Sequence, residues 1–436
     1  MEYYSRMKNS DVGWIQDIPD TWGIRVLFQL ADQVKNKNKD LAEKNLLSLS
    51  YGKIKRKDIN NPEGLLPESF DGYNIIEEND IVLRLTDLQN DHTSLRVGQA
   101  HERGIITSAY TTLRPKESVN PQYLYYSLHA YDLIKGFYGM GAGVRQGLNY
   151  DEVKTIRVPF PSVEEQEKIV KYLDNQCGQI DYAIDDAKVC VEDYKKWKAS
   201  IISEALTKGI DEGADKRDSG IDWIGDIPCS SRIVRLRYLV KNYKAGPFGS
   251  SLITDKLLPR GGILVYTPEH VANKSTESDK NLYLPESRRD EMSQFFLHPG
   301  EIVFPIVGSL GRAMMITDNM PEGIINQRLA KFSLKSGMVD PNYFMWAFGK
   351  SEFFKPYIEV NCRGSFIVNL TKTIVYDMPF VLPDSMVEQK RIADHLENKC
   401  GTIDAMISEK EKIIEDLELY KRSLIYDSIT GKRKVV

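Results

Sequence analysis

Two long stretches of the chain place apolar residues at alternating three- and four-residue steps. Both open with a capping sequence, Ser-Val-Glu-Glu at 162–165 and Ser-Met-Val-Glu at 385–388, in which a Ser hydroxyl bonds to a first-turn amide and a Glu reaches back to the cap. The apolar positions that follow are Ile169, Leu173, Cys177, Ile180, Ile184, Ala187, Val191, Tyr194, Ile201 and Ala205 in the first stretch, and Ile392, Leu396, Cys400, Ile403, Ile407, Ile414, Leu417 and Leu424 in the second. This spacing is typical of a coiled-coil seam. We predict two helices, over 162–209 and 385–430, each roughly 65–70 Å long at a rise of about 1.5 Å per residue.

The chain also repeats itself around these stretches. Trp-Ile-Gln-Asp-Ile-Pro at 14–19 returns as Trp-Ile-Gly-Asp-Ile-Pro at 223–228, and Glu-Gln-Glu-Lys-Ile at 165–169 returns as Glu-Gln-Lys-Arg-Ile at 388–392. Two related halves around an approximate twofold axis set the helices antiparallel, and each helix then buries its apolar stripe on the other. Three polar seam positions are interpreted as lysines whose ammonium groups extend to water: Lys198, Lys410 and Lys421. The open alternative is that the helices belong to two separate bundles.

The segments that precede each helix diverge in sequence and predict mixed α/β structure. Short apolar runs at 81–83, 104–106, 301–303 and 323–325 are bounded by turn residues and predict strands. Asn120-Pro121 and Asp340-Pro341 predict helix starts, each with an Asx cap followed by Pro. The predicted fold class is α+β, with two α/β domains (1–161 and 223–384), an antiparallel two-helix coiled coil between them, a linker at 210–222 and a pseudo-twofold internal repeat.

Composition narrows the class of protein only slightly. The chain has 436 residues, with 42% hydrophobic and 28% charged residues, which is typical of an ordinary globular protein. A net charge of −4 does not by itself indicate a nucleic-acid binder, because local patches matter more than the sum. The five cysteines form no Cys-x-x-Cys pair, so reduced thiols and a cytoplasmic location are expected, without a membrane partner or a bound metal.

One pair of motifs suggests catalysis and was weighed as an alternative. The sequence 120–123 (Asn-Pro-Gln-Tyr) resembles the (D/N)PP(Y/F) motif of amino-methyltransferases, and 137–141 resembles their FxGxG cofactor loop. The third position of the first motif is Gln rather than Pro. The two motifs are about 17 residues apart, too close for a doubly wound sheet, and the second copy has no such loop near Arg363. No phosphate-loop, HExxH or Ser/His/Asp spacing is found, so we expect a non-catalytic chain.

Three segments carry a family resemblance that covers nearly the whole chain. Residues 219–228 resemble the opening segment of type I restriction-modification specificity subunits. The Pro-Phe-Pro-x3-Glu-Gln run at 159–166, followed by a long heptad helix, resembles their conserved region, and 246–252 is similar to a segment of their target-recognition domains. The second copy departs from the first at Ser231, where the first has Trp22, and in the longer run at 379–383. These departures concern local packing.

The resemblance implies a DNA sequence-specificity subunit without chemistry of its own. Residues 1–161 would be target-recognition domain 1 and 223–384 target-recognition domain 2, each for one half of a bipartite, asymmetric site in double-stranded DNA. The conserved helices would dock two adenine methyltransferase (M) subunits, and a translocase/nuclease (R) subunit can join. S-adenosylmethionine, ATP and Mg²⁺ would be bound by those partners, so no cofactor is expected in this chain.

Candidate DNA-contacting residues are cations and amides in glycine-rich or basic segments, since such groups contact phosphates and base edges. In the first half they are Lys53, Lys55, Arg56, Lys57, Arg145 and Gln146, and in the second half Lys244, Gly249, Ser250, Ser251, Arg312, Gln327, Arg328 and Arg363. For each of them the alternative is an ordinary solvated surface residue.

Two other functions remain open. A standalone coiled-coil DNA-binding regulator would bind DNA tightly without an enzyme partner. A purely structural spacer would show no sequence preference in any assembly.

Overall fold

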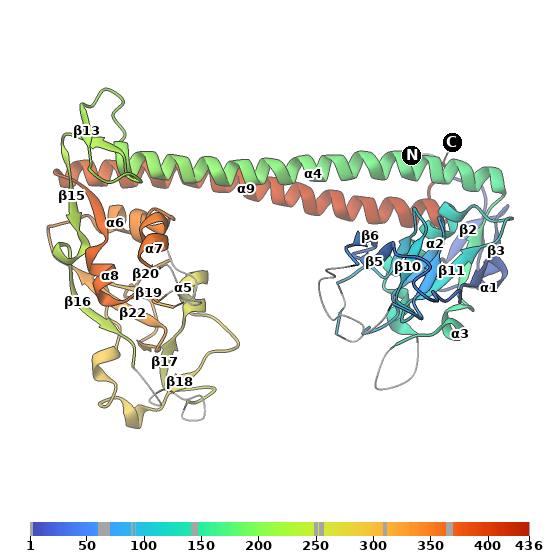
Figure 1. Ribbon diagram of the computed structural model, residues 1–436, viewed down its shortest axis with the longest axis horizontal. Coiled ribbons are helices and arrows are strands. Elements are labelled where there is room, and N and C mark those ends of the chain that lie inside the picture. The colour runs from blue at the N-terminus through green and yellow to red at the C-terminus, as the bar shows by residue number, and fades with distance from the viewer. Residues whose placement is uncertain are drawn as a thin grey trace. The chain divides into compact units, whose positions relative to one another are not determined.

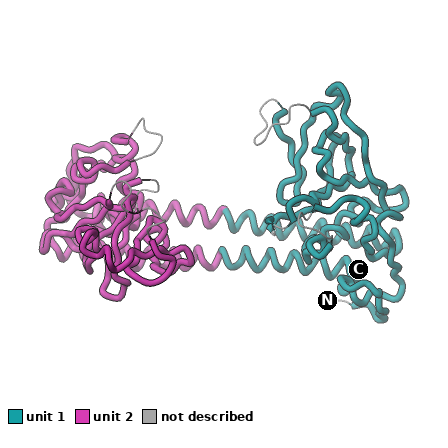
Figure 2. The backbone as a smooth tube through the Cα atoms, turned by 90° about the horizontal axis from the view of Figure 1, so that it is seen from below, with its two compact units in different colours: residues 1–188, 411–436 teal, residues 189–410 magenta. Residues whose placement is uncertain are grey.

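The computed structural model describes residues 3–59, 70–88, 90–91, 93–140, 147–247, 252, 257–307, 312–362 and 369–435. The chain forms two compact units, shown in Figure 2. The first unit comprises Met1–Lys188 and Glu411–Val436, and the second comprises Val189–Lys410. The first unit therefore contains both ends of the chain, and each unit contains part of both long helices.

The two predicted helices are present as α4 (Val163–Lys208, 46 residues) and α9 (Met386–Ile429, 44 residues) (Figure 1). In the second unit Lys198 pairs with Asp404 at 2.6 Å, and Asp211, just beyond α4, pairs with Arg391 at 3.1 Å. Residue numbers thus rise along α4 as they fall along α9. In the first unit Asp181 pairs with Lys421 at 2.6 Å. The antiparallel prediction is confirmed within each unit, and the separate-bundle alternative is wrong.

Apolar side chains of α4 and α9 are buried together in both units. In the first unit Ile169, Leu173 and Ile180 share a core cluster with Leu424, Ile425 and Ile429. In the second unit Ile202, Ala205 and Leu206 share one with Ile392, Leu396 and Cys400. Burial of a side chain of this size contributes about 1.5–3 kcal/mol. The seam predicted from the heptad spacing is therefore the shared core of the two helices.

The remainder of the first unit is an α+β domain built on two four-stranded sheets. One has the strand order β4-β11-β8-β9, and the other has the order β6-β5-β10-β7, in which β5 and β10 run parallel. A two-stranded pair, β12-β3, and a hairpin, β1-β2, complete it. The elements are β1 (Met7–Asn9), β2 (Asp17–Pro19), β3 (Gly23–Val26), α1 (Leu27–Leu30), β4 (Ala31–Gln33), β5 (Leu46–Ser50), β6 (Lys53–Lys57), β7 (Asn74–Ile76), β8 (Ile81–Leu83), β9 (Val97–Gln99), β10 (Gly104–Ile106), β11 (Thr111–Pro115), α2 (Pro121–Leu133), η1 (Gly136–Gly139), α3 (Tyr150–Val153) and β12 (Arg157–Phe160).

The α+β domain of the second unit has the same plan. Its main sheet has the order β16-β22-β19-β20, its second sheet the order β18-β17-β21 with β17 and β21 parallel, and β15-β23 and β13-β14 match the two smaller pairs. Helix α6 lies beside the start of α9, with the main sheet beyond it (Figure 1). The elements are β13 (Lys216–Asp218), β14 (Asp226–Pro228), β15 (Ser231–Arg235), β16 (Val240–Ala245), β17 (Ile263–Tyr266), α5 (Pro268–Asn273), β18 (Tyr283–Leu284), β19 (Glu301–Pro305), β20 (Met314–Met315), β21 (Gly323–Ile325), β22 (Leu329–Leu334), α6 (Pro341–Phe348), α7 (Lys355–Asn361), α8 (Lys372–Asp377) and β23 (Pro379–Pro383).

The two domains therefore share a topology although their sequences diverge. The four predicted strands are confirmed as β8, β10, β19 and β21. The predicted Asx caps are confirmed as well, because the side chains of Asn120 and Asp340 accept hydrogen bonds from the amides of Tyr123 and Tyr343. The predicted domain divisions at 161 and 384 stay predictions.

The predicted capping boxes of the long helices are only half right. Ser162 Oγ accepts from the amide of Glu165, and Ser385 Oγ accepts from the amide of Val387. The glutamates have other partners. Glu165 accepts from the hydroxyl of Tyr4 at 2.6 Å, and Glu388 pairs with Arg391 at 2.6 Å. A tertiary partner in α4 and a local i,i+3 partner in α9 therefore replace the bond back to the cap.

A buried glutamine joins each long helix to its domain. Gln166 accepts from the amide of Asn120 and donates to the carbonyl of Pro161, at 3.2 and 3.0 Å. Gln389 makes the equivalent bonds to Asp340 and Pro383, at 2.7 and 2.9 Å. Both side chains are buried. Each glutamine thus ties together the start of the long helix, the end of the last strand and the first turn of the domain helix.

The ends of the long helices close each unit on its opening hairpin. Gly431, after α9, has a φ of +71°, and a Cβ there would lie 2.3 Å from Pro19 Cδ. Tyr426 of α9 also donates its hydroxyl to the carbonyl of Trp14 at 2.7 Å. Gly209, after α4, has a φ of +73° and lies against Pro228 in the second unit. The C-terminal end of each long helix therefore packs on the first hairpin of the other sequence repeat.

We predict that Gln389→Leu destabilises the second unit by about 2–4 kcal/mol, because the amide of Asp340 and the carbonyl of Pro383 lose a buried partner. Urea unfolding followed by hydrogen exchange resolved to each unit measures the effect. Gln179→Leu is the matched control, since Gln179 is exposed and bonds only along α4 to Asn175. Equal stability of the two variants would contradict the role assigned to Gln389.

Candidate nucleic-acid interface

The basic run of the first half forms β6, which within the described residues is an edge strand paired with β5. Lys53, Lys55, Arg56 and Lys57 are exposed on it, whereas Ile54 packs against the core. Arg56 is engaged within the domain, because its guanidinium pairs with Glu102. Lysines on an edge strand also prevent pairing with another sheet, so the strand's charge has a structural explanation beside a DNA-contacting one.

Part of the second-half candidate set is brought together around one tight contact. Gly246 follows β16, and a Cβ there would lie 1.9 Å from the carbonyl oxygen of Asn326. This close approach places the end of the Lys244 strand against the turn that presents Gln327 and Arg328, both of which are exposed. The ammonium of Lys244 bonds to Gln294 and lies 5.2 Å from the ring centroid of Phe295.

Several candidates lie outside the described residues. They are Arg145, Gln146, Gly249, Ser250, Ser251 and Arg363. Arg312 is described and exposed, and it lies in a cleft of the second unit rather than beside Gln327 and Arg328.

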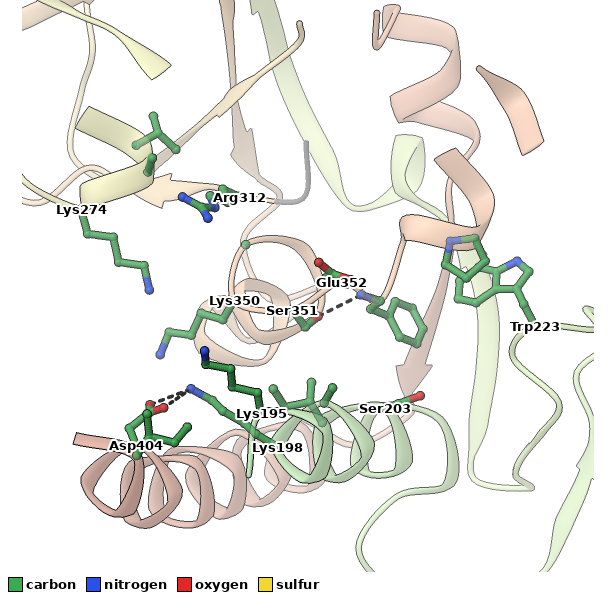
Figure 3. Close-up of a pocket in the computed structure, with 18 residues that line it drawn as sticks. Lys195, Lys198, Ser203, Trp223, Lys274, Arg312, Lys350, Ser351, Glu352 and Asp404 are labelled. Atoms are coloured by element: carbon green, nitrogen blue, oxygen red, sulfur yellow. Dashed lines mark hydrogen bonds and ion pairs between the residues drawn. The ribbon is translucent and has the colours of Figure 1, made fainter. Parts of the chain in front are cut away.

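This cleft, named here the second cleft, has a volume of about 820 Å³ and is shown in Figure 3. One wall is formed by α4 and α9, and the other by the end of α5, the segment around Arg312 and the turn after α6. Its lining includes five cations from four separate segments and two carboxylates: Lys195, Lys198, Lys274, Arg312, Lys350, Glu352 and Asp404. The cations lie at the end of the cleft away from Trp223 (Figure 3).

Three of these cations have carboxylate partners at the rim. Lys198 pairs with Asp404 at 2.6 Å, Lys195 with Glu192 at 2.9 Å and Lys350 with Glu397 at 2.7 Å. Lys274 and Arg312 form no ion pair with any residue in the described part of the chain. Burial, followed by the positive charges of Lys350 and Lys198, lowers the pKa of Lys274. Like charges therefore face one another across the second cleft.

A smaller cleft of about 400 Å³, the first cleft, lies in the equivalent position of the first unit. In the internal repeat Asp181 aligns with Asp404, and Lys198 aligns with Lys421. The Asp181–Lys421 pair of the first cleft therefore corresponds to the Asp404–Lys198 pair of the second. The lysines, histidines and aspartates that line the first cleft are Lys53, His101, His129, Asp174, Asp181 and Lys421. Its lysines and carboxylates balance, in contrast to the second cleft.

His129 is an ionisable group of the first cleft whose pKa is lowered. Its ring is buried and stacks on Tyr125, with centroids 5.5 Å apart and planes 8° apart. Burial, with smaller contributions from the positive charges of Lys421 and Arg422, lowers the pKa of His129 to about 4. His129 is therefore neutral at physiological pH.

The structure also explains the motif that suggested a methyltransferase. Asn120 uses its side chain as a helix cap, and the buried hydroxyl of Tyr123 donates to the carbonyl of Pro159 at 3.1 Å. Phe137 is buried in the core within η1, and 141 lies outside the described residues. The side chain of Asn120 is thus engaged in capping α2, and that of Tyr123 joins α2 to β12.

Three cations of the second cleft were not predicted as site residues from the sequence: Lys195, Lys274 and Lys350. Lys198 and Lys421 were predicted only as lysines that reach water, whereas each pairs with an aspartate across the helix seam. The available signal was the recurrence of Ile180-Asp181 as Ile403-Asp404, which places an acid opposite each lysine in an antiparallel register.

Metal-binding and membrane-spanning features were considered for the described residues. No group of three or more His, Cys, Asp or Glu side chains among them is arranged to hold a metal ion. Among the same residues, no helix has the length and apolar character required to span a bilayer. Within the described ranges, Cys177, Cys190, Cys229 and Cys400 form no disulfide.

The chain therefore contains two α+β domains of one topology, each packed on part of the antiparallel helix pair. The sequence model of the family described as "Type I restriction modification DNA specificity domain" matches residues 19–182. The "Type I restriction enzyme MjaVIII specificity subunit" of Methanocaldococcus jannaschii is 27% identical over 369 residues, covering 83% of this chain and 80% of that protein. A second relative from that organism, named for the MjaX type I restriction enzyme specificity subunit, is 23% identical across 100% of this chain and 99% of its own length.

A solved structure agrees with these relatives in fold. Its title describes complex assembly and conformational transition of the type I R-M system. The two chains match with a TM-score of 0.68 at 13% sequence identity, over 95% of this chain and 99% of the other. Over most of its length the chain is thus similar to specificity subunits of type I restriction enzymes.

We predict that acidification destabilises the first unit through His129. Its folded pKa of about 4 lies below the unfolded value of about 6.5, so the stabilisation present above pH 6.5 is lost as the pH falls through 4. The loss is about 3 kcal/mol by pH 4, at 1.36 kcal/mol per pKa unit.

Urea unfolding of the wild type and of His129→Phe between pH 7 and pH 4 measures this loss, because phenylalanine keeps the ring but cannot be protonated. His101→Gln, at an exposed position lining the same cleft, is the control and should follow the wild type. Parallel pH curves for the wild type and His129→Phe would contradict the prediction.

Proposed function

We propose that this chain is the DNA sequence-specificity subunit of a type I restriction-modification complex in which each α+β domain reads one half of a bipartite, asymmetric site in double-stranded DNA. The observation that carries the proposal is the construction of one topology twice with different exposed residues. An identical pair of domains would favour a symmetric site, and two unrelated folds would not indicate a duplicated task. Two versions of one fold are suited to two different half-sites.

The family supports the same conclusion, since both relatives are named as specificity subunits. The candidate DNA-contacting residues in this proposal are those of β6, the turn around Gln327 and Arg328, and Arg312, together with the candidates outside the described residues. Base readout requires side chains such as Arg and Gln, and cations position the duplex through its phosphates.

The proposed protein partners are two adenine methyltransferase subunits, with translocase/nuclease subunits able to join. Support comes from the outer faces of the long helices, where related positions of the two halves leave aromatic side chains exposed. Trp197 of α4 is 50% exposed, and Tyr420 at the equivalent position of α9 is 43% exposed. Such residues are enriched at protein interfaces, and their recurrence suits two copies of one partner. In this proposal S-adenosylmethionine, ATP and Mg²⁺ are bound by the partners.

Co-expression with the methyltransferase, followed by single-molecule detection of modified adenines, tests the proposal. We expect methylation at one motif whose two half-sites differ and are separated by unspecified bases. Methylation that does not depend on this chain would contradict the proposal. Tight sequence-specific DNA binding by the chain alone, together with no effect on methylation, would instead favour the standalone regulator.

We further propose that the helix pair sets the spacing between the half-sites, because α4 and α9 each run through both units. Deleting one heptad from each helix, 184–190 and 407–413, keeps the 3.5-residue period and removes roughly 10 Å of helix. We expect the unspecified spacer to change by about three base pairs, at about 34 Å per turn of DNA. Sequencing of the modified genome measures the spacer, and an unchanged spacer with methylation retained would contradict the proposal.

A further inference from the structure

The two clefts occupy equivalent positions but differ in charge. Each contains a seam lysine paired with an aspartate, Lys421 with Asp181 in the first cleft and Lys198 with Asp404 in the second. These two ion pairs are common to both clefts. The clefts differ in the other charged residues that line them.

Apart from the Lys421–Asp181 pair, the first cleft is lined by one positive and one negative side chain. Lys53 of β6 is balanced by Asp174 of α4, whose carboxylate accepts from the hydroxyl of Tyr126 at 2.7 Å. His129 adds no charge at neutral pH, since burial lowers its pKa to about 4. The first cleft is therefore electrically balanced.

In the second cleft two positive charges are left over. Lys195 and Lys350 have carboxylate partners at the rim, and Glu352 is paired with Lys355 at 2.9 Å. Lys274, at the C-terminal end of α5, and Arg312, before β20, have no such partner among the described residues. Figure 3 shows Lys274 directed across the cleft toward Lys350 and the lysines of α4.

Cations held close together without counter-charges are electrostatically unfavourable, and an anion between them relieves the repulsion. The arrangement is open to solvent, has a volume of about 820 Å³, and presents cations from both walls. Phosphate diesters match this chemistry, because a nucleic-acid strand supplies regularly spaced negative charge without requiring an apolar anchor.

We infer that the second cleft binds the phosphate backbone of the DNA, through Lys274 and Arg312 with Lys195, Lys198 and Lys350 in support, and that it does so more strongly than the balanced first cleft. The inference rests on the proposed function and adds an asymmetry to it: the second half supplies more of the salt-dependent affinity. Lys274 and Arg312 belong to the α+β domain, so a phosphate held there also fixes the position of that domain on the duplex. The competing occupant is an acidic segment of a protein partner.

The test is DNA affinity as a function of salt for the full chain, purified together with its methyltransferase. Fluorescence anisotropy with a duplex carrying the methylated motif, and with an unrelated duplex of equal length, gives the slope of log K against log salt between roughly 50 and 300 mM KCl. The double variant Lys274→Ala/Arg312→Ala should make the slope shallower by about two, since each phosphate contact contributes about 0.9. Affinity should fall about tenfold or more on both duplexes at the lower salt, with their ratio unchanged.

Two further variants make the result specific. Lys274→Arg/Arg312→Lys keeps both charges and should retain the wild-type slope. Lys171→Ala/Lys399→Ala removes two exposed lysines of the long helices that line neither cleft, and it should change the slope by much less. Thermal unfolding checks that each variant is folded.

An unchanged slope for Lys274→Ala/Arg312→Ala would overturn the inference, as would an equal loss in the control. Loss of methyltransferase from the purified complex, with the DNA slope unchanged, would overturn it in favour of the acidic protein segment. Failure of the proposed function looks different. The wild type would bind both duplexes equally, while the effect of the cleft variant on the slope would persist.

Discussion

The buried glutamine at the start of each long helix is the interaction on which the arrangement of each unit depends. Gln166 and Gln389 each bridge two backbone groups that belong to different segments, the last strand and the domain helix. A buried amide left without partners costs about 1–3 kcal/mol, so the three segments are held together or all are destabilised. The glutamine that both copies place in the first turn of the long helix is therefore structural. It attaches an α+β domain to its helix in one orientation within the unit.

A second constraint is the register of the helix pair. A pure apolar stripe tolerates sliding by a heptad, whereas a lysine in the seam is satisfied only opposite an acid. The pairs Lys198–Asp404 and Lys421–Asp181 supply that specificity in the two units. Because they border the two clefts, the lysines that select the register also contribute to the electrostatics of each cleft. Lys198 thus belongs both to the helix seam and to the proposed DNA-binding surface.

The similarity to known proteins and the clefts contribute different information about function. The similarity supports the proposed class of subunit. The charge difference between the clefts is a property of this chain, and it arises from Lys274, Arg312 and the residues that surround them. In a duplicated protein, the two halves can keep the same fold while they diverge in how strongly each binds the DNA backbone. Such divergence is compatible with an asymmetric site, where only the sum of the two contributions sets affinity.

The sequence by itself determined the elements whose signals are local or repeated. The heptad spacing predicted α4 and α9, the Asx-Pro pairs predicted α2 and α6, and the internal repeat predicted the antiparallel pairing. It failed where a residue's partner lies far along the chain. Glu165 was expected to complete a local cap but bonds to Tyr4. Only the tertiary structure brought Lys195, Lys274, Arg312 and Lys350 to one cleft, because they come from four segments with no shared motif. Periodicity records which face of a helix is buried, but the convergence of charges depends on how distant segments fold together.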